Sequence, residues 1–158
     1  MQLCKGFVFL GIPTRVGLSA LALLKILNHE FPTPFEITQF YNEFDIIENH
    51  NIDFVRKPLK RSKFNGRHCM YLDWIEGQTL KEAFKGKHED VEDFLHIAIA
   101  LADVLGKLHE RNIVHKDINP NNILVDLQAR DVHIISFGIA SKLSSKEQHL
   151  GNPDQLEG

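Results

Sequence analysis

One segment, residues 113–125, constrains the fold of this 158-residue chain more than any other. Its sequence is IVHKDINPNNILV, in which Asp117 and Asn122 stand five positions apart. The residues before the segment, 91–111, have the spacing of a long amphipathic helix. The apolar residues at the end of the segment, 123–125, indicate a short strand. The segment therefore predicts a loop held between a helix and a strand, with a carboxylate and an amide at a fixed spacing.

Short apolar runs predict strands in the first half of the chain. They lie at residues 7–10, 18–27, 52–55 and 69–75. Lys25 stands out because it is the single charged residue in the second run. The basic, polar segment 57–67 between the last two runs indicates a hairpin-like excursion.

A helix is predicted from Thr33 onward. Pro34 suits its first position, and Glu36 completes a capping box with the threonine. Glu43 lies at the edge of the apolar face of this helix, so it can point toward whatever the helix packs on. That face contains Ile37, Phe40, Tyr41, Phe44 and Ile47.

The second half of the chain begins with polar residues, 85–90, and continues with the long helix predicted at 91–111. Strands are predicted at 123–125 and 132–135, around a turn at 126–131. The stripe of the long helix that is expected to face the core contains Phe94, Ala98, Leu101, Leu105 and Leu108.

Composition bounds the function classes. A net charge of −3, with 43% apolar residues, is that of an ordinary globular domain and predicts neither a nucleic-acid nor a membrane partner. No apolar run approaches the roughly 20 residues that span a bilayer. Cys4 and Cys69 stand alone, without metal-ligand spacing, and are interpreted as small buried residues of a protein in the reducing cytoplasm.

Three matches at the right positions carry a family resemblance. Residues 113–125 resemble the catalytic loop of protein kinases, H-R-D-x-x-x-x-N followed by a strand. The run Ala-Leu-Leu-Lys that ends at Lys25 is similar to the V-A-I-K strand, and Ile-Ser-Phe-Gly at 135–138 lies where the family has D-F-G. More narrowly, residues 6–158 resemble the Ser/Thr-kinase-like domain at the start of large bacterial-type signalling proteins, which an ATPase module and often a sensor histidine kinase follow.

The resemblance implies an α+β, bilobal, protein-kinase-like fold. Residues 1–77 would form a nearly complete small lobe and hinge, with an antiparallel sheet and one helix. Residues 78–158 would form the first part of a helical large lobe. Because the chain ends at Gly158, before any A-P-E motif, it is expected to be a piece of a longer protein.

The resemblance also implies roles for particular residues. Asp117 would orient the substrate hydroxyl, Asn122 would bind Mg²⁺, and Lys25 would hold ATP phosphates while it pairs with Glu43. The site residues implied for the nucleotide are Lys25, Gly6, Val8, Asn122 and Ser136. The partners implied are ATP and a protein substrate or covalently linked signalling modules.

Several positions depart from the family pattern. Ser136 replaces the D-F-G aspartate, and its neutral hydroxyl would leave Mg²⁺ weakly anchored. Met1 and Leu3 stand where the first two glycines of the glycine-rich loop belong. Lys116 replaces an arginine, and Asn119 stands where many Ser/Thr kinases have a lysine.

Structural interpretations stay open beside these functional ones. Lys25 could be a solvated edge lysine and Glu43 an exposed helix residue. Asp117 and Asn122 could cap a turn, and His115 is interpreted as a structural brace of its loop. The basic segment from Arg56 to Lys63 is interpreted as a solvated loop, with a docking patch as the alternative.

The resemblance favours a domain that binds ATP and, in its family, transfers the γ-phosphate to a protein serine or threonine in signal transduction. Ser136 and the end of the chain favour an alternative, a catalytically impaired pseudokinase or regulatory fragment. Whether this chain is an enzyme is therefore left open, and alone it is expected to be weakly active or inactive. A small-molecule kinase of the aminoglycoside or choline type ranks last, because Phe137 and Gly138 follow Ser136.

Overall fold

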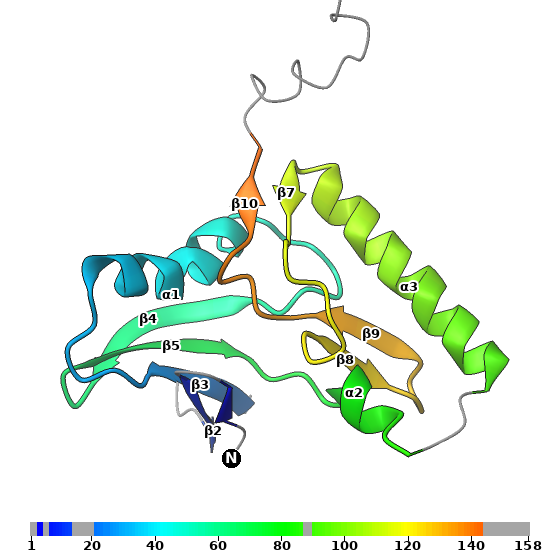
Figure 1. The fold of residues 1–158 in the computed structure, drawn as a ribbon, viewed down its shortest axis with the longest axis horizontal. Helices are drawn as coiled ribbons and strands as arrows, with labels where there is room; N and C mark the ends of the chain where they lie inside the picture. The colour runs from blue at the N-terminus through cyan, green and yellow to red at the C-terminus, as the bar shows by residue number, and fades with distance from the viewer. Residues whose placement is uncertain (1–2, 5–6, 14–20, 87–89, 144–158) are drawn as a thin grey trace, which may run out of the picture.

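The structure is a computed structural model that describes residues 3–4, 7–13, 21–86 and 90–143, with side chains from residue 22 onward. Its first half is a five-stranded antiparallel sheet with the helix α1 against it, and its second half contains the long helix α3 and short strands (Figure 1). The expected α+β class is confirmed. The sheet has the order β1-β2-β3-β5-β4. Its strands are β1 (Leu3–Cys4), β2 (Phe7–Pro13), β3 (Leu21–Leu27), β4 (Pro58–Phe64) and β5 (Arg67–Asp73).

The helix α1 (Pro34–Ile47) begins as the sequence predicts. Thr33 Oγ1 accepts a hydrogen bond from the Glu36 amide at 3.3 Å, and Glu36 Oε2 accepts one from the Thr33 amide at 2.8 Å. Phe40 is 1% exposed, and burying a side chain of this size contributes about 1.5–3 kcal/mol. The cluster between helix and sheet contains Phe40, Leu23, Leu27, Met70 and Leu72.

In the first half, one prediction is confirmed in part and another is wrong. The hairpin expected at residues 57–67 is present, but the segment is more than a connection, because β4 fills most of it and pairs with β5. Asn65 and Gly66 join the two strands with φ angles of 48° and 77°, the conformation of a two-residue hairpin turn. Residues 52–55 form no strand; Val55 makes a single parallel bridge to Ile134.

The second half contains a three-stranded sheet of order β6-β8-β9 and a separate pair, β7 and β10. The two strands predicted around the turn at 126–131 are confirmed as β8 and β9. The bounds of these elements are β6 (Gln78–Thr79), α2 (Leu80–Ala83), α3 (Val91–His109), β7 (Ile113–Val114), β8 (Ile123–Asp126), β9 (Asp131–Ile134) and β10 (Ser141–Lys142).

The stripe with which the long helix α3 faces its core matches the predicted one in part, because Leu101, Leu105 and Leu108 pack in the core. Phe94 is 54% exposed and Ala98 is also exposed, so the first two members of the predicted stripe point outward. Both candidate stripes have helical spacing, and the position of β9 beside the helix decides between them. The buried residues of α3 are Ile97, Val104 and Leu108.

The connection between the two halves passes through Gly77. Its φ is 123°, and a Cβ at this position would lie 2.7 Å from the carbonyl oxygen of Val125, so only glycine fits. The division of the chain after residue 77 stays a prediction. In the part of the chain that the structure describes, no helix is long and apolar enough to cross a membrane.

Candidate functional site

The side chain of Lys25 forms a buried ion pair with Glu43. Lys25 Nζ lies 2.6 Å from Glu43 Oε2, and the two side chains are 5% and 1% exposed. Lys25 comes from β3, the middle strand of the sheet, and Glu43 from the face of α1 that packs on the sheet. These positions do not fit the alternative interpretations of a solvated edge lysine and an exposed helix glutamate. The ion pair fixes the position of α1 relative to the sheet.

The loop after β7 holds Asp117 between two asparagine amides. Asn122 Nδ2 donates to Asp117 Oδ2 at 2.7 Å and to the Asp117 carbonyl oxygen at 2.9 Å. Asn119 Nδ2 donates to Asp117 Oδ1 at 2.9 Å. Both carboxylate oxygens are thus oriented, while the Asp117 side chain stays exposed. This arrangement can present a fixed carboxylate to a hydroxyl group that approaches from solvent.

His115 braces this loop against the strand after it. Its Nε2 donates to the carbonyl oxygen of Ile135 at 3.0 Å, and its Nδ1 accepts a hydrogen bond from the Asp117 amide at 3.2 Å. Its ring packs edge-on against Phe137, with 4.6 Å between the centroids. Burial lowers the pKa of His115. The hydrogen bond to Ile135 and the carboxylates of Asp117 and Glu43 raise this pKa, but by less than burial lowers it. The imidazole is therefore neutral at neutral pH, as its hydrogen bonds require.

Because His115 is buried in its neutral form, we predict that acid destabilises the domain. Burial also lowers the pKa of His133. Because each histidine binds its proton less readily when folded, stability is full above the ordinary pKa of 6.5 and falls as the pH drops below it. The free energy of unfolding in urea should fall by about 1 kcal/mol or more between pH 7 and pH 5. His133→Asn should flatten this slope and a substitution of the exposed His109 should not; a flat profile for the unaltered chain would contradict the assignment.

Comparison with known proteins places the chain in a family. The model of the protein kinase domain matches residues 8–155. The chain belongs to the protein kinase family. This kinase domain is 29% identical to a probable serine/threonine-protein kinase of Clostridium perfringens over 153 residues, which cover 89% of the chain and 22% of that protein.

Two further relatives agree with this assignment. The kinase domain is 24% identical over 162 residues to the serine/threonine-protein kinase pkn2 of Myxococcus xanthus, with 96% of the chain and 19% of that protein covered. It is 35% identical over 98 residues to the serine/threonine-protein kinase PrkC of Bacillus subtilis, with 55% and 15% covered. The chain thus spans about a fifth of the length of these relatives.

Protein kinases as a family use ATP and Mg²⁺, and Ser136 stands where this kinase domain would need its main metal ligand. Its φ is 71°, and the Ile135 amide before it donates to the Asn122 carbonyl oxygen at 3.0 Å. The two side chains that the family pattern assigns to the metal here, the Asn122 amide and the Ser136 hydroxyl, are both neutral. Mg²⁺ prefers one or two carboxylates, and no group of three potential acidic, histidine or cysteine ligands occurs among the described residues. These residues do not fit a tightly held Mg²⁺.

The remaining residues of the predicted nucleotide site are described only in part. Val8 lies in β2 opposite Ile26 of β3, and its side chain is outside the description. Gly6 lies outside the described residues altogether. The structure therefore brings together Lys25 with Glu43, and Asp117 with Asn122. His115 contacts the second of these pairs, because its Nδ1 accepts a hydrogen bond from the Asp117 amide at 3.2 Å.

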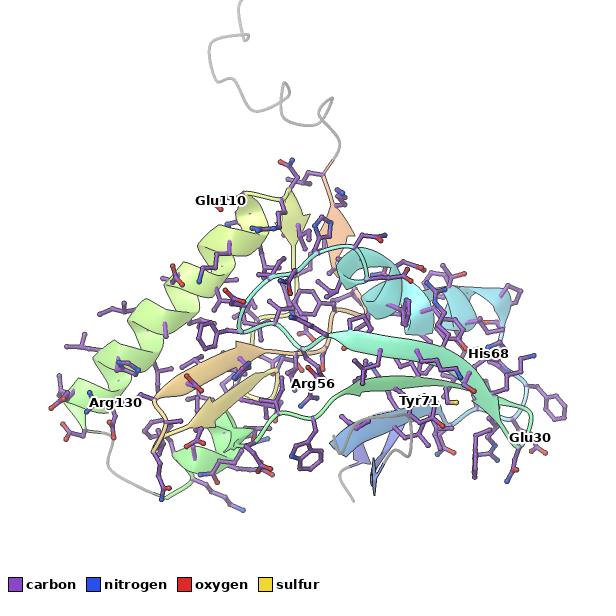
Figure 2. All side chains as sticks on the ribbon, turned by 180° about the vertical axis from the view of Figure 1, so that it is seen from behind. Glu30, Arg56, His68, Tyr71, Glu110 and Arg130 are labelled. Atoms are coloured by element: carbon purple, nitrogen blue, oxygen red, sulfur yellow. The ribbon has the colours of Figure 1, made fainter. Side chains whose placement is uncertain are left out.

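Arg56 is not part of a solvated loop, contrary to the sequence interpretation. It is 8% exposed and lies between β5 and the three-stranded sheet (Figure 2). There its backbone amide donates to the carbonyl oxygen of Ile134 at 3.1 Å. Burial lowers the pKa of its guanidinium, and the carboxylates of Glu43 and Asp73 raise it. Its Nε finds no hydrogen-bond partner among the described residues. Only the contact with the second half of the chain could reveal this burial, and the sequence does not show that contact.

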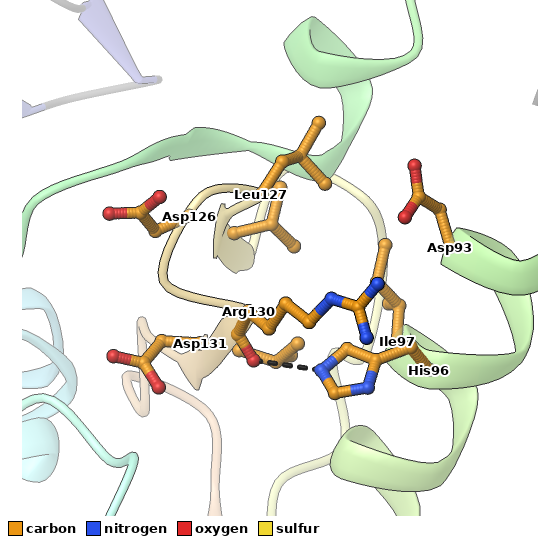
Figure 3. A pocket seen from close by; sticks show the side chains of 9 residues that line it. Asp93, His96, Ile97, Asp126, Leu127, Arg130 and Asp131 are labelled. Carbon is orange, nitrogen blue, oxygen red and sulfur yellow. Dashed lines mark hydrogen bonds between the residues drawn. The ribbon is translucent and has the colours of Figure 1, made fainter.

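A shallow pocket lies away from these residues, between the start of α3 and the β8–β9 turn (Figure 3). There His96 Nε2 donates to the carbonyl oxygen of Arg130 at 2.9 Å, and Arg130 pairs with Glu92 at 3.1 Å. None of the residues assigned to the kinase site lines it. His96 and Arg130, two of the residues that line it, thus bond to each other, which favours a structural role for them.

Proposed function

We propose that this kinase domain binds ATP beside the Lys25–Glu43 pair and that its transfer of phosphate to a protein serine or threonine is strongly impaired. The observation that carries the proposal is the combination of a buried Lys25–Glu43 ion pair with a serine at position 136. The ion pair favours nucleotide binding. The serine removes the carboxylate that would hold the metal during transfer.

Each residue has a role in this proposal. Lys25, oriented by Glu43, would hold the phosphates, because an ammonium group in a dry environment attracts them strongly. Asp117 would orient the hydroxyl of the substrate, held in place by Asn119 and Asn122. Ser136 would leave the charge of the phosphates only partly neutralised. Loss of one such electrostatic contribution commonly costs several kcal/mol, and each 1.36 kcal/mol is tenfold in rate.

A protein kinase with ordinary activity is the second candidate. It is favoured by the fixed carboxylate of Asp117 and by the serine/threonine-protein kinases among the relatives. The partners, a protein substrate or covalently linked signalling modules, and a cytoplasmic location are part of the same proposal.

Stabilisation by nucleotide tests the binding proposal. Because ATP would bind only the folded chain, saturating ATP should raise the melting temperature of the unaltered protein by several degrees, and Lys25→Met should abolish the rise. The exposed Lys60 offers a matched control, since Lys60→Met removes a lysine from the same sheet. A melting temperature that ATP leaves unchanged in the unaltered protein would contradict the proposal.

A further inference from the structure

The side of α3 that points away from the core is apolar along most of the helix. Its residues lie three or four positions apart, so they form one stripe opposite Ile97 and Val104, which face the core. Val91 and Ile99 are each 70% exposed, and Leu95 is 52% exposed. Figure 1 shows α3 along one border of the molecule, with β7 and β9 on its inner side. This stripe, the outer face of α3, contains Val91, Leu95, Ala98, Ile99, Ala102 and Gly106.

An apolar outer face is unusual for a helix at the border of a domain. Such a helix normally has charged residues on the side away from the core, and an exposed apolar patch commonly marks a surface for another protein. The outer face of α3 contains no charged residue over about four helical turns, a length of roughly 22 Å. The face therefore fits an elongated, apolar partner such as another helix.

Gly106 is the least expected residue of the outer face. It lies within the helix, because its carbonyl oxygen accepts a hydrogen bond from the Glu110 amide at 2.9 Å. Glycine is among the least favourable residues at such a position, yet a Cβ added at Gly106 would meet no atom within 4 Å. No contact among the described residues therefore requires a glycine here. A missing side chain does let the backbone of another element approach closely, which indicates a partner at this position.

The side chains of the outer face decrease in size from its beginning to its end. The large Leu95 and Ile99 lie in the first half, and the small Ala102 and Gly106 lie in the second. In two antiparallel copies of α3, Leu95 of each copy would lie across from Gly106 of the other. Ile99 would lie across from Ala102 in the same way. Each large side chain then meets a small one, as close packing between helices requires.

The charges at the two ends of α3 favour the same orientation. Three carboxylates lie at its beginning, at residues 90, 92 and 93, and Arg130 offsets one of them through its pair with Glu92. At its end, the positive side chains at residues 107 and 111 outnumber the glutamate at 110. Antiparallel packing places the acidic end of each helix beside the more basic end of the other, and it aligns the helix dipoles favourably. A parallel pair would bring like ends together.

We infer that the outer face of α3 binds a second copy of this chain, with the two α3 helices packed antiparallel about a twofold axis. Size order and charge order make this face complementary to itself. A twofold interface uses each residue twice, so that one substitution alters two contacts. The inference does not rest on the proposed binding of ATP, and the association needs no nucleotide.

Sedimentation equilibrium of the unaltered chain over a range of concentrations measures this association. We expect a monomer–dimer equilibrium that Leu95→Glu weakens at least about a hundredfold, because the dimer would bury two carboxylates without partners. Leu59→Glu is the matched control, since Leu59 on β4 is also a leucine of 52% exposure, and it should leave the equilibrium unchanged. A chain that stays monomeric, association that continues beyond the dimer, or equal effects of the two substitutions would overturn the inference.

An exchange of charges tests the antiparallel orientation. Gly106→Lys should prevent association, although the added side chain has open space in a single folded chain. In the double variant Leu95→Glu/Gly106→Lys, each glutamate would lie opposite a lysine of the other copy. The dimer should therefore return, with an affinity that falls as salt is raised. The two positions are about 16 Å apart along one helix, so they cannot pair within a chain. If the double variant stays monomeric while the unaltered chain dimerises, the antiparallel pairing is wrong.

Discussion

Ser136→Asp should make ATP binding depend strongly on Mg²⁺. A carboxylate beside the Asn122 amide would complete a ligand pair of the kind that Mg²⁺ prefers. ATP should then bind at least about tenfold more tightly in excess Mg²⁺ than in a chelator, since one charge-assisted contact contributes about 1.5–3 kcal/mol. Isothermal titration of the variant under both conditions measures this ratio.

The backbone at position 136 favours this substitution. Its φ of 71° lies in the left-handed region, where aspartate and asparagine occur more often than serine. The variant should therefore fold at least as stably as the unaltered chain. Ser136→Asn is the matched control, because it has the same backbone preference and nearly the same shape without the charge. If Ser136→Asn gains the same Mg²⁺ dependence, the carboxylate is not its cause.

Glu43→Leu should lower the free energy of unfolding by about 3–5 kcal/mol. The substitution leaves the ammonium of Lys25 in a site where only 5% of its side chain is exposed, without the carboxylate 2.6 Å away. A buried charge that loses its partner is costly, and about 3–5 kcal/mol is a large part of the stability of a domain of this size. Urea denaturation followed by circular dichroism measures the loss.

The double variant Lys25→Met/Glu43→Leu should recover most of that loss. With both charges removed, two apolar side chains of similar volume fill the space beside Phe40, whose ring centroid lies 5.9 Å from Lys25 Nζ. Replacing a buried ion pair in this way is often neutral. If the double variant is as unstable as Glu43→Leu alone, the loss does not come from the separation of the Lys25 ammonium from the Glu43 carboxylate.

Local signals in the sequence were enough to predict much of the fold and of the site. The start of α1 follows from Thr33, Pro34 and Glu36, because a capping box is made by residues three positions apart. Lys25 and Glu43 were expected to meet from the resemblance, and the structure pairs them. The loop that holds Asp117 and Asn122 was equally accessible, because its residues are close in sequence.

The errors come from contacts between distant parts of the chain. The face of α3 depends on where β9 lies, so helical periodicity alone could not choose between Phe94 and Ile97. Asn42 contacts residues 95 to 98 positions further along the chain, and nothing in the sequence around it indicates this. The strand β4 was not predicted for another reason: a hairpin was expected at this place, but the basic, polar composition of the segment hid the strand itself.

Isothermal titration of the unaltered chain with ATP, in excess Mg²⁺ and in a chelator, tests the central claim most directly. The claim is that Lys25 and Glu43 support nucleotide binding while Ser136 leaves the metal without a strong ligand. ATP should bind under both conditions, with affinities that differ by less than about threefold, because the neutral donors at the site contribute little to metal binding. Absence of binding under both conditions, or binding tightened tenfold or more by Mg²⁺, would contradict this account.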